Sequence, residues 1–109
     1  MLPETVRSLA FGSISGTYAG IGSSFANPVY WFYLQNLTDK LLMFSWDGVN
    51  DHFPLPTNGY VIMDVSANKT IQGGAFMISQ GTRFYVKTTS AGAPASGSVY
   101  LSVFYGFST

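Results

Sequence analysis

The chain contains no cysteine, one histidine and one glutamate, and it has few charged residues of either sign. Without cysteine, no disulfide, thiolate metal ligand or nucleophilic thiol is available. Charged residues make up 9% of the 109 residues, and the formal net charge is zero. An average soluble domain has about 25% charged residues. The five basic residues are scattered, which excludes the basic face that nucleic-acid phosphates require.

Long hydrophobic runs are also lacking. No stretch approaches the roughly 18 apolar residues of a membrane-spanning helix, so we expect no membrane partner. Residues 1–7 do not combine a basic leader with an apolar block, and they predict no secretory signal. The length predicts one domain, residues 1–109, which is large enough to bury a core without a metal or a disulfide.

Aromatic residues are abundant at 17% of the chain, and many fall in short runs bounded by Gly, Pro and Asn. We expect strands at residues 8–14, 17–22, 29–36, 41–46, 60–66, 75–78, 83–87 and 99–107. About eight short strands with turn signals roughly every 8–12 residues predict an all-β fold. The fold class is therefore a single antiparallel β-sandwich, either jelly-roll or Ig-like.

The strongest strand pattern is residues 29–36, which is apolar on both faces and is therefore central or covered by another subunit. Strict alternation would place Val29, Trp31 and Tyr33 on one face. Residues 36–40 are polar enough for a hairpin loop that leads into 41–46 as the return strand. Prolines exclude residues 53–56 from a central strand, and Asn58-Gly59 predicts a tight turn.

Two polar groups invite chemistry. Asp47, Asn50 and Asp51 could offer oxygen ligands to calcium, but their spacing differs from an EF-hand and suits ordinary turn hydrogen bonding better. His52 beside Asp51 could form half of an acid–base pair. No Gly-x-Ser-x-Gly element lies between a strand and a helix, so His52 is interpreted as a structural turn residue. We expect no catalytic residues, no metal and no cofactor, and therefore no enzyme.

The surface chemistry points to assembly. A neutral, aromatic-rich, charge-poor surface is typical of a subunit covered by its neighbours, although a small β-domain can also present Ser, Thr and Asn to water. Residues 1–16 are a possible extended docking arm that adds a strand to a neighbour's sheet edge. The candidate protein interface comprises Leu2, Val6, Leu9, Phe11, Tyr30, Trp31 and Tyr33.

The aromatic side chains allow a second interpretation. Rings on a strand face can stack on sugars as well as pack against protein. Strand alternation turns some of them outward, so an exposed aromatic face is expected. We favour protein over sugar as its partner. The rings considered for stacking are Tyr30, Trp31, Tyr33, Trp46 and Tyr60.

Motifs along nearly the whole chain resemble small virion proteins of tailed bacteriophages. The motifs are Ile21-Gly22, Asn27-Pro28, 34–39 (LQNLTD), 44–48 (FSWDG), 51–53 (DHF), 56–60 (PTNGY), 64–69 (DVSANK), 80–87 (QGTRFYVK), 97–100 (GSVY) and Tyr105-Gly106. The family is mostly described only as structural, and no catalytic residues are attached to it.

This resemblance implies a noncatalytic structural component of a tailed-phage virion. We expect a capsid cement or decoration protein, or a head–neck accessory protein, that assembles in the host bacterial cytoplasm. Its partners would be copies of itself and major capsid, neck or tail subunits. The alternative is a tail-associated module that binds host-surface glycans.

Overall fold

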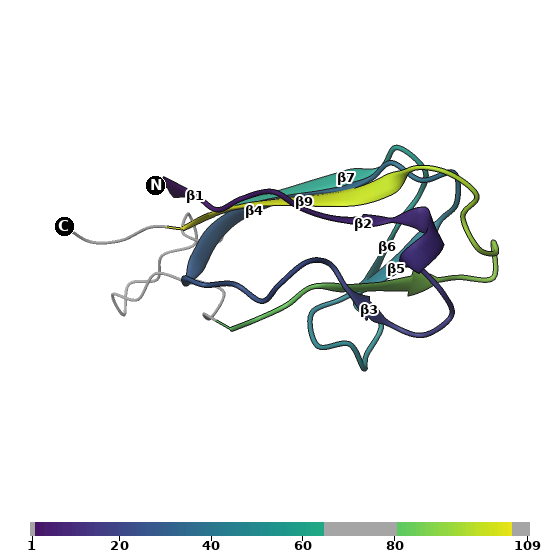
Figure 1. Cartoon of the computed structure of the whole chain (residues 1–109), viewed down its shortest axis with the longest axis horizontal. Helices are drawn as coiled ribbons and strands as arrows, with labels where there is room; N and C mark the ends of the chain where they lie inside the picture. Colours follow the sequence, from purple (N-terminus) through teal and green to yellow (C-terminus); the bar gives the residue numbers. More distant parts are fainter. Residues whose placement is uncertain (1, 65–80, 106–109) are drawn as a thin grey trace.

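The computed structural model describes residues 2–64 and 81–105. They form two antiparallel sheets packed face to face, which confirms the predicted β-sandwich (Figure 1). The strands are β1 (Leu2–Pro3), β2 (Arg7–Ala10), β3 (Ala19–Gly20), β4 (Val29–Asn36), β5 (Leu42–Ser45), β6 (Phe53–Leu55), β7 (Tyr60–Asp64), β8 (Tyr85–Thr88) and β9 (Ser98–Tyr105), with one 3₁₀ turn, η1 (Phe11–Ser13).

The strand order distinguishes the two expected sandwich types. Sheet A has the order β1-β9-β4-β7, with β2 also pairing with β9, and sheet B has the order β3-β8-β5-β6. From β2 onward the chain changes sheet at each step between consecutive strands except from β5 to β6. In an Ig-type sandwich several consecutive strands share a sheet. The order found here is that of a jelly roll.

The core lies between the sheets and follows the expected alternation. In β9, Val99, Leu101 and Val103 are fully buried, and in β8 Val86 is fully buried beside Phe84. A set of aromatic rings fills the centre, because Phe32 packs edge-on against both Trp46 and Phe84 at centroid distances of 5.3 and 5.2 Å. Edge-to-face packing of this kind adds to the area burial that drives folding.

The alternation in β4 differs from the prediction at its start. Val29 pairs with Tyr105 and Trp31 with Phe104, so Tyr30 forms a bulge opposite the step between the two β9 residues. One extra residue in a strand turns the side chains before the bulge to the opposite face of the sheet. Val29 is therefore buried in the core while Trp31 faces outward, and the expectation that they share a face was wrong.

The expected hairpin between residues 29–36 and 41–46 was also wrong. β4 pairs with β7 and β9, whereas β5 pairs with β6 and β8 in the other sheet. The buried side chain of Asn36 organises this crossover. Its Nδ2 donates to the carbonyls of Lys40 (2.9 Å) and Leu55 (2.8 Å), and its Oδ1 accepts from the backbone and hydroxyl of Thr38. These bonds hold the chain in a tight corner between the sheets.

Within the possible docking arm, residues 1–16, the strands β1 and β2 pair with the protein's own β9. Arg7 pairs with Leu101 and Ala10 with Ser98, so β2 forms an edge of sheet A beside β9. The strand is shorter than the expected 8–14 because η1 follows at Phe11. Leu9 packs against the core, while Val6 and Phe11 are exposed. Docking of this segment onto a neighbour stays a prediction.

The turn predictions match the structure. The proline-containing β6 lies at the edge of sheet B, and Asn58 adopts a left-handed backbone with a φ of 63° immediately before Gly59. The strand expected at residues 75–78 and the end of the one expected at 60–66 lie outside the described residues.

Candidate functional site

The outer surface of sheet A carries a continuous group of aromatic and aliphatic side chains. The register places Tyr33 between Ile62 of β7 and Ser102 of β9, with Trp31 opposite Phe104. Side chains in register on one side of a sheet are direct neighbours. We call this surface the aromatic face; it comprises Trp31, Tyr33, Tyr60, Ile62, Tyr100 and Phe104.

The rings of the aromatic face pack against each other and remain accessible. Trp31 meets Phe104 edge-on at a centroid distance of 4.6 Å, and Tyr33 meets Tyr60 edge-on at 5.8 Å. The Tyr33 hydroxyl accepts a hydrogen bond from Gln35 at 2.8 Å. Tyr60 is 61% and Ile62 51% exposed. The register places one charged residue on this face, Asp64, which pairs with Trp31 at the end of β7; the other positions of this face carry no charge.

The outer surface of sheet B is different. Met43 pairs with Lys87 there. The Lys87 ammonium lies 3.0 Å from the Asp51 carboxylate and 4.7 Å from the centre of the Tyr18 ring. Burial, followed by the hydrogen bond that its hydroxyl donates to Asp51, raises the pKa of Tyr18. The two faces therefore differ in composition: in the described part of the chain the outer surface of sheet A is mainly aromatic and aliphatic, with Asp64 at its margin, whereas that of sheet B carries the Lys87–Asp51 ion pair.

An apolar pocket of about 420 Å³ opens beside β6 and β7 and is lined by Phe32, Trp46, Phe53, Leu55, Tyr60, Val61 and Met63. Trp46 lies half-buried in the wall of this pocket, and the centroid of its ring is 4.0 Å from the centroid of the Phe84 ring. Tyr60 belongs both to this pocket and to the aromatic face. Of the rings considered for sugar stacking, the structure thus brings Tyr33 and Tyr60 into contact and places Trp46 in the pocket wall.

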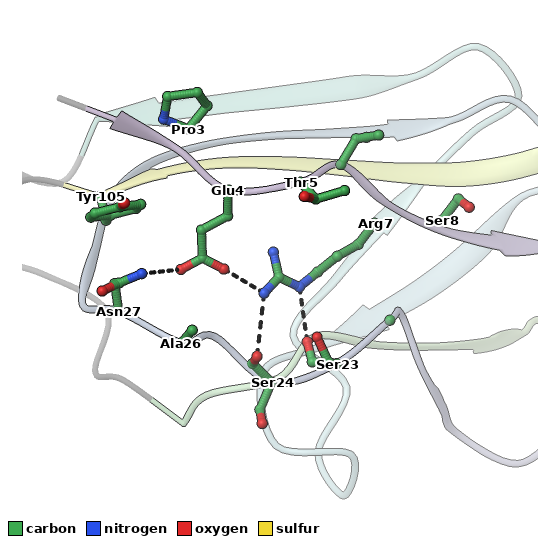
Figure 2. Close-up of a pocket in the computed structure, with 12 residues that line it drawn as sticks. Pro3, Glu4, Thr5, Arg7, Ser8, Ser23, Ser24, Ala26, Asn27 and Tyr105 are labelled. Carbon is green, nitrogen blue, oxygen red and sulfur yellow. Dashed lines mark hydrogen bonds and ion pairs between the residues drawn. The ribbon is translucent and has the colours of Figure 1, made fainter.

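A polar pocket of about 590 Å³ lies where the chain bulges between β1 and β2 (Figure 2). Its floor holds a buried ion pair between Glu4 and Arg7. Arg7 Nε donates to the Ser23 carbonyl at 2.9 Å, Nη2 donates to the Ser24 carbonyl at 3.2 Å, and Asn27 Nδ2 donates to the second Glu4 oxygen at 3.1 Å. These contacts join the edge strands of sheet A to the loop between β3 and β4.

The electrostatics of the ion pair favour its charged form. Burial raises the pKa of Glu4. Hydrogen bonds from Arg7 and Asn27, together with the positive charge of Arg7, lower this pKa by more than burial raises it, so the net shift is downward. The Arg7 guanidinium also lies 5.0 Å from the centre of the Phe25 ring. Sequence reasoning missed this pair. The i, i+3 spacing of opposite charges was its only local signal, since the remaining partners lie 16 to 23 residues away.

The residues weighed for calcium form a turn. The Asp47 carboxylate accepts hydrogen bonds from the backbone of Val49 (2.8 Å) and Asn50 (2.9 Å) and from the Asn50 side chain. Backbone hydrogen bonds from Asn50 and Val49 lower the pKa of Asp47. Its oxygens are therefore engaged within the turn. No group of three metal-ligating side chains is found within residues 2–64 and 81–105.

His52 and Ser45 also act within this turn. The backbone N–H of Trp46 donates to His52 Nδ1 at 2.9 Å. The buried Ser45 hydroxyl donates to Asp47 at 2.9 Å and accepts from the backbone of Gly48 at 2.9 Å. A Ser-His-Asp set would need the serine proton to face the imidazole. Here the Ser45 hydroxyl donates its hydrogen bond to Asp47 instead. The hydrogen bonds of this segment are those of a structural turn.

Of the seven predicted interface residues, Trp31 and Tyr33 lie on the aromatic face. Tyr30 lies in the β4 bulge, and the structure does not describe the side chain of Leu2. The predicted interface did not include Tyr60, Ile62, Tyr100 and Phe104, which share the aromatic face with Trp31 and Tyr33. The alternation of residues within β7 and β9 had already placed these four side chains on the side of each strand that faces away from the core. No local pattern, however, indicates that β7 and β9, which are distant in sequence, both flank β4.

No helix in the described part of the chain is long and apolar enough to span a membrane. Searches against protein-family models, curated proteins and solved structures find no match to this chain.

Proposed function

We propose that the chain is a noncatalytic structural subunit of a tailed-phage virion and acts through protein–protein contacts of its aromatic face. The observation that carries the proposal is this aromatic surface with a single acidic position, Asp64, at its margin, on which Tyr60 and Ile62 are more than half exposed. Contiguous exposed apolar patches on soluble proteins mark interaction sites. Depletion of charge together with enrichment in Tyr, Trp and Phe is the composition of an interface core.

The virion assignment rests on the motif resemblance, with support by analogy from the fold. Jelly rolls are frequent in viral capsid domains, although they also occur in lectins and other proteins. Symmetric copies on a particle would cover the aromatic face of each subunit with a neighbour.

Charge insertion tests the role of the aromatic face. Ile62→Lys places an ammonium in its middle, and Val49→Lys makes the same change at a residue that is 78% exposed on the β5–β6 turn. Sedimentation velocity should show wild type and Val49→Lys as oligomers. Ile62→Lys should be a folded monomer, or an oligomer weaker by roughly 30–1000-fold for a loss of about 2–4 kcal/mol. A monomeric wild type, or equal assembly of both variants, would refute this role.

The particle itself tests the virion assignment. Mass spectrometry of particles purified from infected cells should find the chain in a fixed ratio to the major capsid protein. Its absence from washed particles would refute the assignment while leaving self-assembly untouched.

The glycan alternative has one specific observation in its favour, namely the exposed Tyr60 ring beside Tyr33. Aromatic rings on a rigid sheet can stack on the apolar faces of sugars. Glycan-array binding that is lost in Tyr60→Ala and kept in Val49→Lys would support this second function. Absence of binding by the dissociated chain, in which no neighbour covers Tyr60, would refute the glycan role.

A further inference from the structure

The edges of the two sheets differ in how well they are protected against pairing with another chain. Natural edge strands are commonly short, bulged or interrupted by proline. Among the described strands, β3 at one edge of sheet B has two residues, and β6 at the other edge contains Pro54. At the β1–β2 edge of sheet A, the pairing with β9 shifts by one residue between Pro3 and Arg7, and the charged Arg7 is buried. These three edges are poor templates for a further strand.

The strand β7 lacks these protections. It forms the opposite edge of sheet A and runs over five residues, Tyr60–Asp64, without proline, glycine or a shift in its register with β4. The side chains of Tyr60 and Ile62 are more than half exposed. A regular, largely apolar edge strand of this kind is a ready template for the addition of another strand.

The hydrogen-bond pattern shows which backbone groups of β7 face the open edge. The Asn36 N–H donates to the Gly59 carbonyl at 2.9 Å, and hydrogen-bonded pairs alternate along an antiparallel ladder. The alternate residues Tyr60, Ile62 and Asp64 therefore direct their backbone N–H and C=O groups away from β4. In the described part of the chain, no other strand pairs with β7 and no loop bonds to these groups.

The register identifies the partner that fits this edge. The N-terminal segment of a neighbour is already engaged with its own β9, whereas a second β7 is self-complementary. When two copies run antiparallel around Ile62, each Tyr60 lies opposite an Asp64, so all the outward backbone groups pair and no like charges meet. Centring on Asp64 would set two acidic residues opposite each other, which is destabilising. Centring on Tyr60 would bring Pro56, which has no N–H, into the ladder.

We propose that β7 pairs antiparallel with β7 of a second copy of this chain across a two-fold axis at Ile62, so that sheet A continues from one copy into the other. Such a contact uses the same surface on both copies and closes as a dimer. It is additional to the contact proposed above, because the aromatic faces of the two copies would form one continuous surface that stays open to other neighbours.

The apolar pocket gives a second observation at the same side of the sandwich. Met63 is in register with the buried Phe32 on the core side of sheet A, yet it is 43% exposed where the pocket opens beside β6 and β7. A second copy joined along β7 would lie next to this opening and shield its apolar lining from water.

Amide hydrogen exchange of the full ¹⁵N-labelled chain tests the pairing. It is followed by NMR at one concentration where the chain is dissociated and one where it is associated, both set by sedimentation velocity. The amides of Val61 and Met63 bond to β4 and should be protected at both. The amides of Tyr60 and Ile62 should exchange freely in the dissociated chain and at least about tenfold more slowly in the associated chain. A contact of the aromatic face alone would leave these two amides without a partner.

Proline variants locate the contact, with circular dichroism to confirm that each is folded. Ile62→Pro removes the N–H at the centre of the pairing and none that bonds to β4, a position at which an edge strand accepts proline. It should associate at least about tenfold more weakly than Ile62→Ala, which shortens the side chain but keeps the N–H. Ser8→Pro removes an N–H that points away from β9 on the β2 edge, and it should associate like the wild type.

Four results would each overturn the proposal. They are a wild-type chain that stays monomeric, equal exchange of the Tyr60 and Ile62 amides in both states, equal association of Ile62→Pro and Ile62→Ala, and protection of the two amides already in the dissociated chain. The second and third would leave assembly through the aromatic face standing. The fourth would show that the chain itself occupies this edge.

Discussion

Replacement of Asn36 by alanine should cost more stability than any other single polar substitution named here. The side chain is fully buried at the corner between the sheets and takes part in four hydrogen bonds, two donated by Nδ2 and two accepted by Oδ1. At a net value of about 1 kcal/mol each, their loss amounts to about 4 kcal/mol. A domain of this size has a free energy of unfolding of roughly 5–15 kcal/mol, so the variant should retain only part of it.

Urea unfolding followed by circular dichroism and tryptophan fluorescence measures this loss. The midpoint for Asn36→Ala should fall strongly while the m-value stays unchanged. Asn50→Ala is the control, because Asn50 lies on an exposed turn and its side chain donates one hydrogen bond to Asp47; its effect should be within about 0.5 kcal/mol. If Asn36→Ala lies within about 1 kcal/mol of this control, the corner is held by something other than the Asn36 side chain.

Three further predictions concern single contacts. Gly97 has a φ of 89°, and a Cβ at this position would clash with the Leu37 carbonyl oxygen. Gly97→Ala should therefore lower the free energy of unfolding by about 3 kcal/mol. A melting temperature equal to that of the wild type would contradict this. The lowered pKa of Glu4 means that its contribution to stability is present above its unfolded pKa of about 4.3 and is lost as the pH falls through the lower folded value. Glu4→Gln should therefore show a flatter fall in melting temperature between about pH 5 and 2, and parallel curves would show that the ion pair adds nothing. His52→Ala removes the acceptor for the Trp46 N–H and should cost about 1 kcal/mol without changing the sedimentation coefficient; loss of assembly would place His52 in an interface.

Local alternation predicted much of the fold. The buried positions of β8 and β9, the proline edge strand and the Asn58-Gly59 turn follow from the period of two, the missing proline donor and the left-handed turn position. Each of these signals depends on a few adjacent residues. For that reason they could be predicted without knowing which strands are neighbours.

Sheet membership could not be predicted in the same way. The pattern of residues 36–46 suits a hairpin, but the Asn36 side chain bonds to Leu55, 19 residues away, and this distant contact helps to turn the chain into the other sheet. The Tyr30 bulge depends on the fit between β4 and β9, which no local pattern encodes. The polar pocket likewise depends on loop carbonyls that meet Arg7 only in the folded chain.

The aromatic face was predicted in composition but only partly in residues. The aromatic runs predicted an exposed aromatic face, and Trp31 and Tyr33 lie on it. Tyr60 and Tyr100 joined them through the pairing of β7 and β9 with β4. The N-terminal segment pairs with β9 of its own chain through Leu2–Pro3 and Arg7–Ala10.

Hydroxyl-radical footprinting of the assembled and the dissociated protein tests the central claim most directly, namely that neighbouring subunits cover the aromatic face. Tyr60, Ile62 and Tyr100 should be oxidised in the dissociated chain and protected in the assembly, while Val49 reacts equally in both. Equal oxidation of Tyr60 and Ile62 in the two states would contradict the claim.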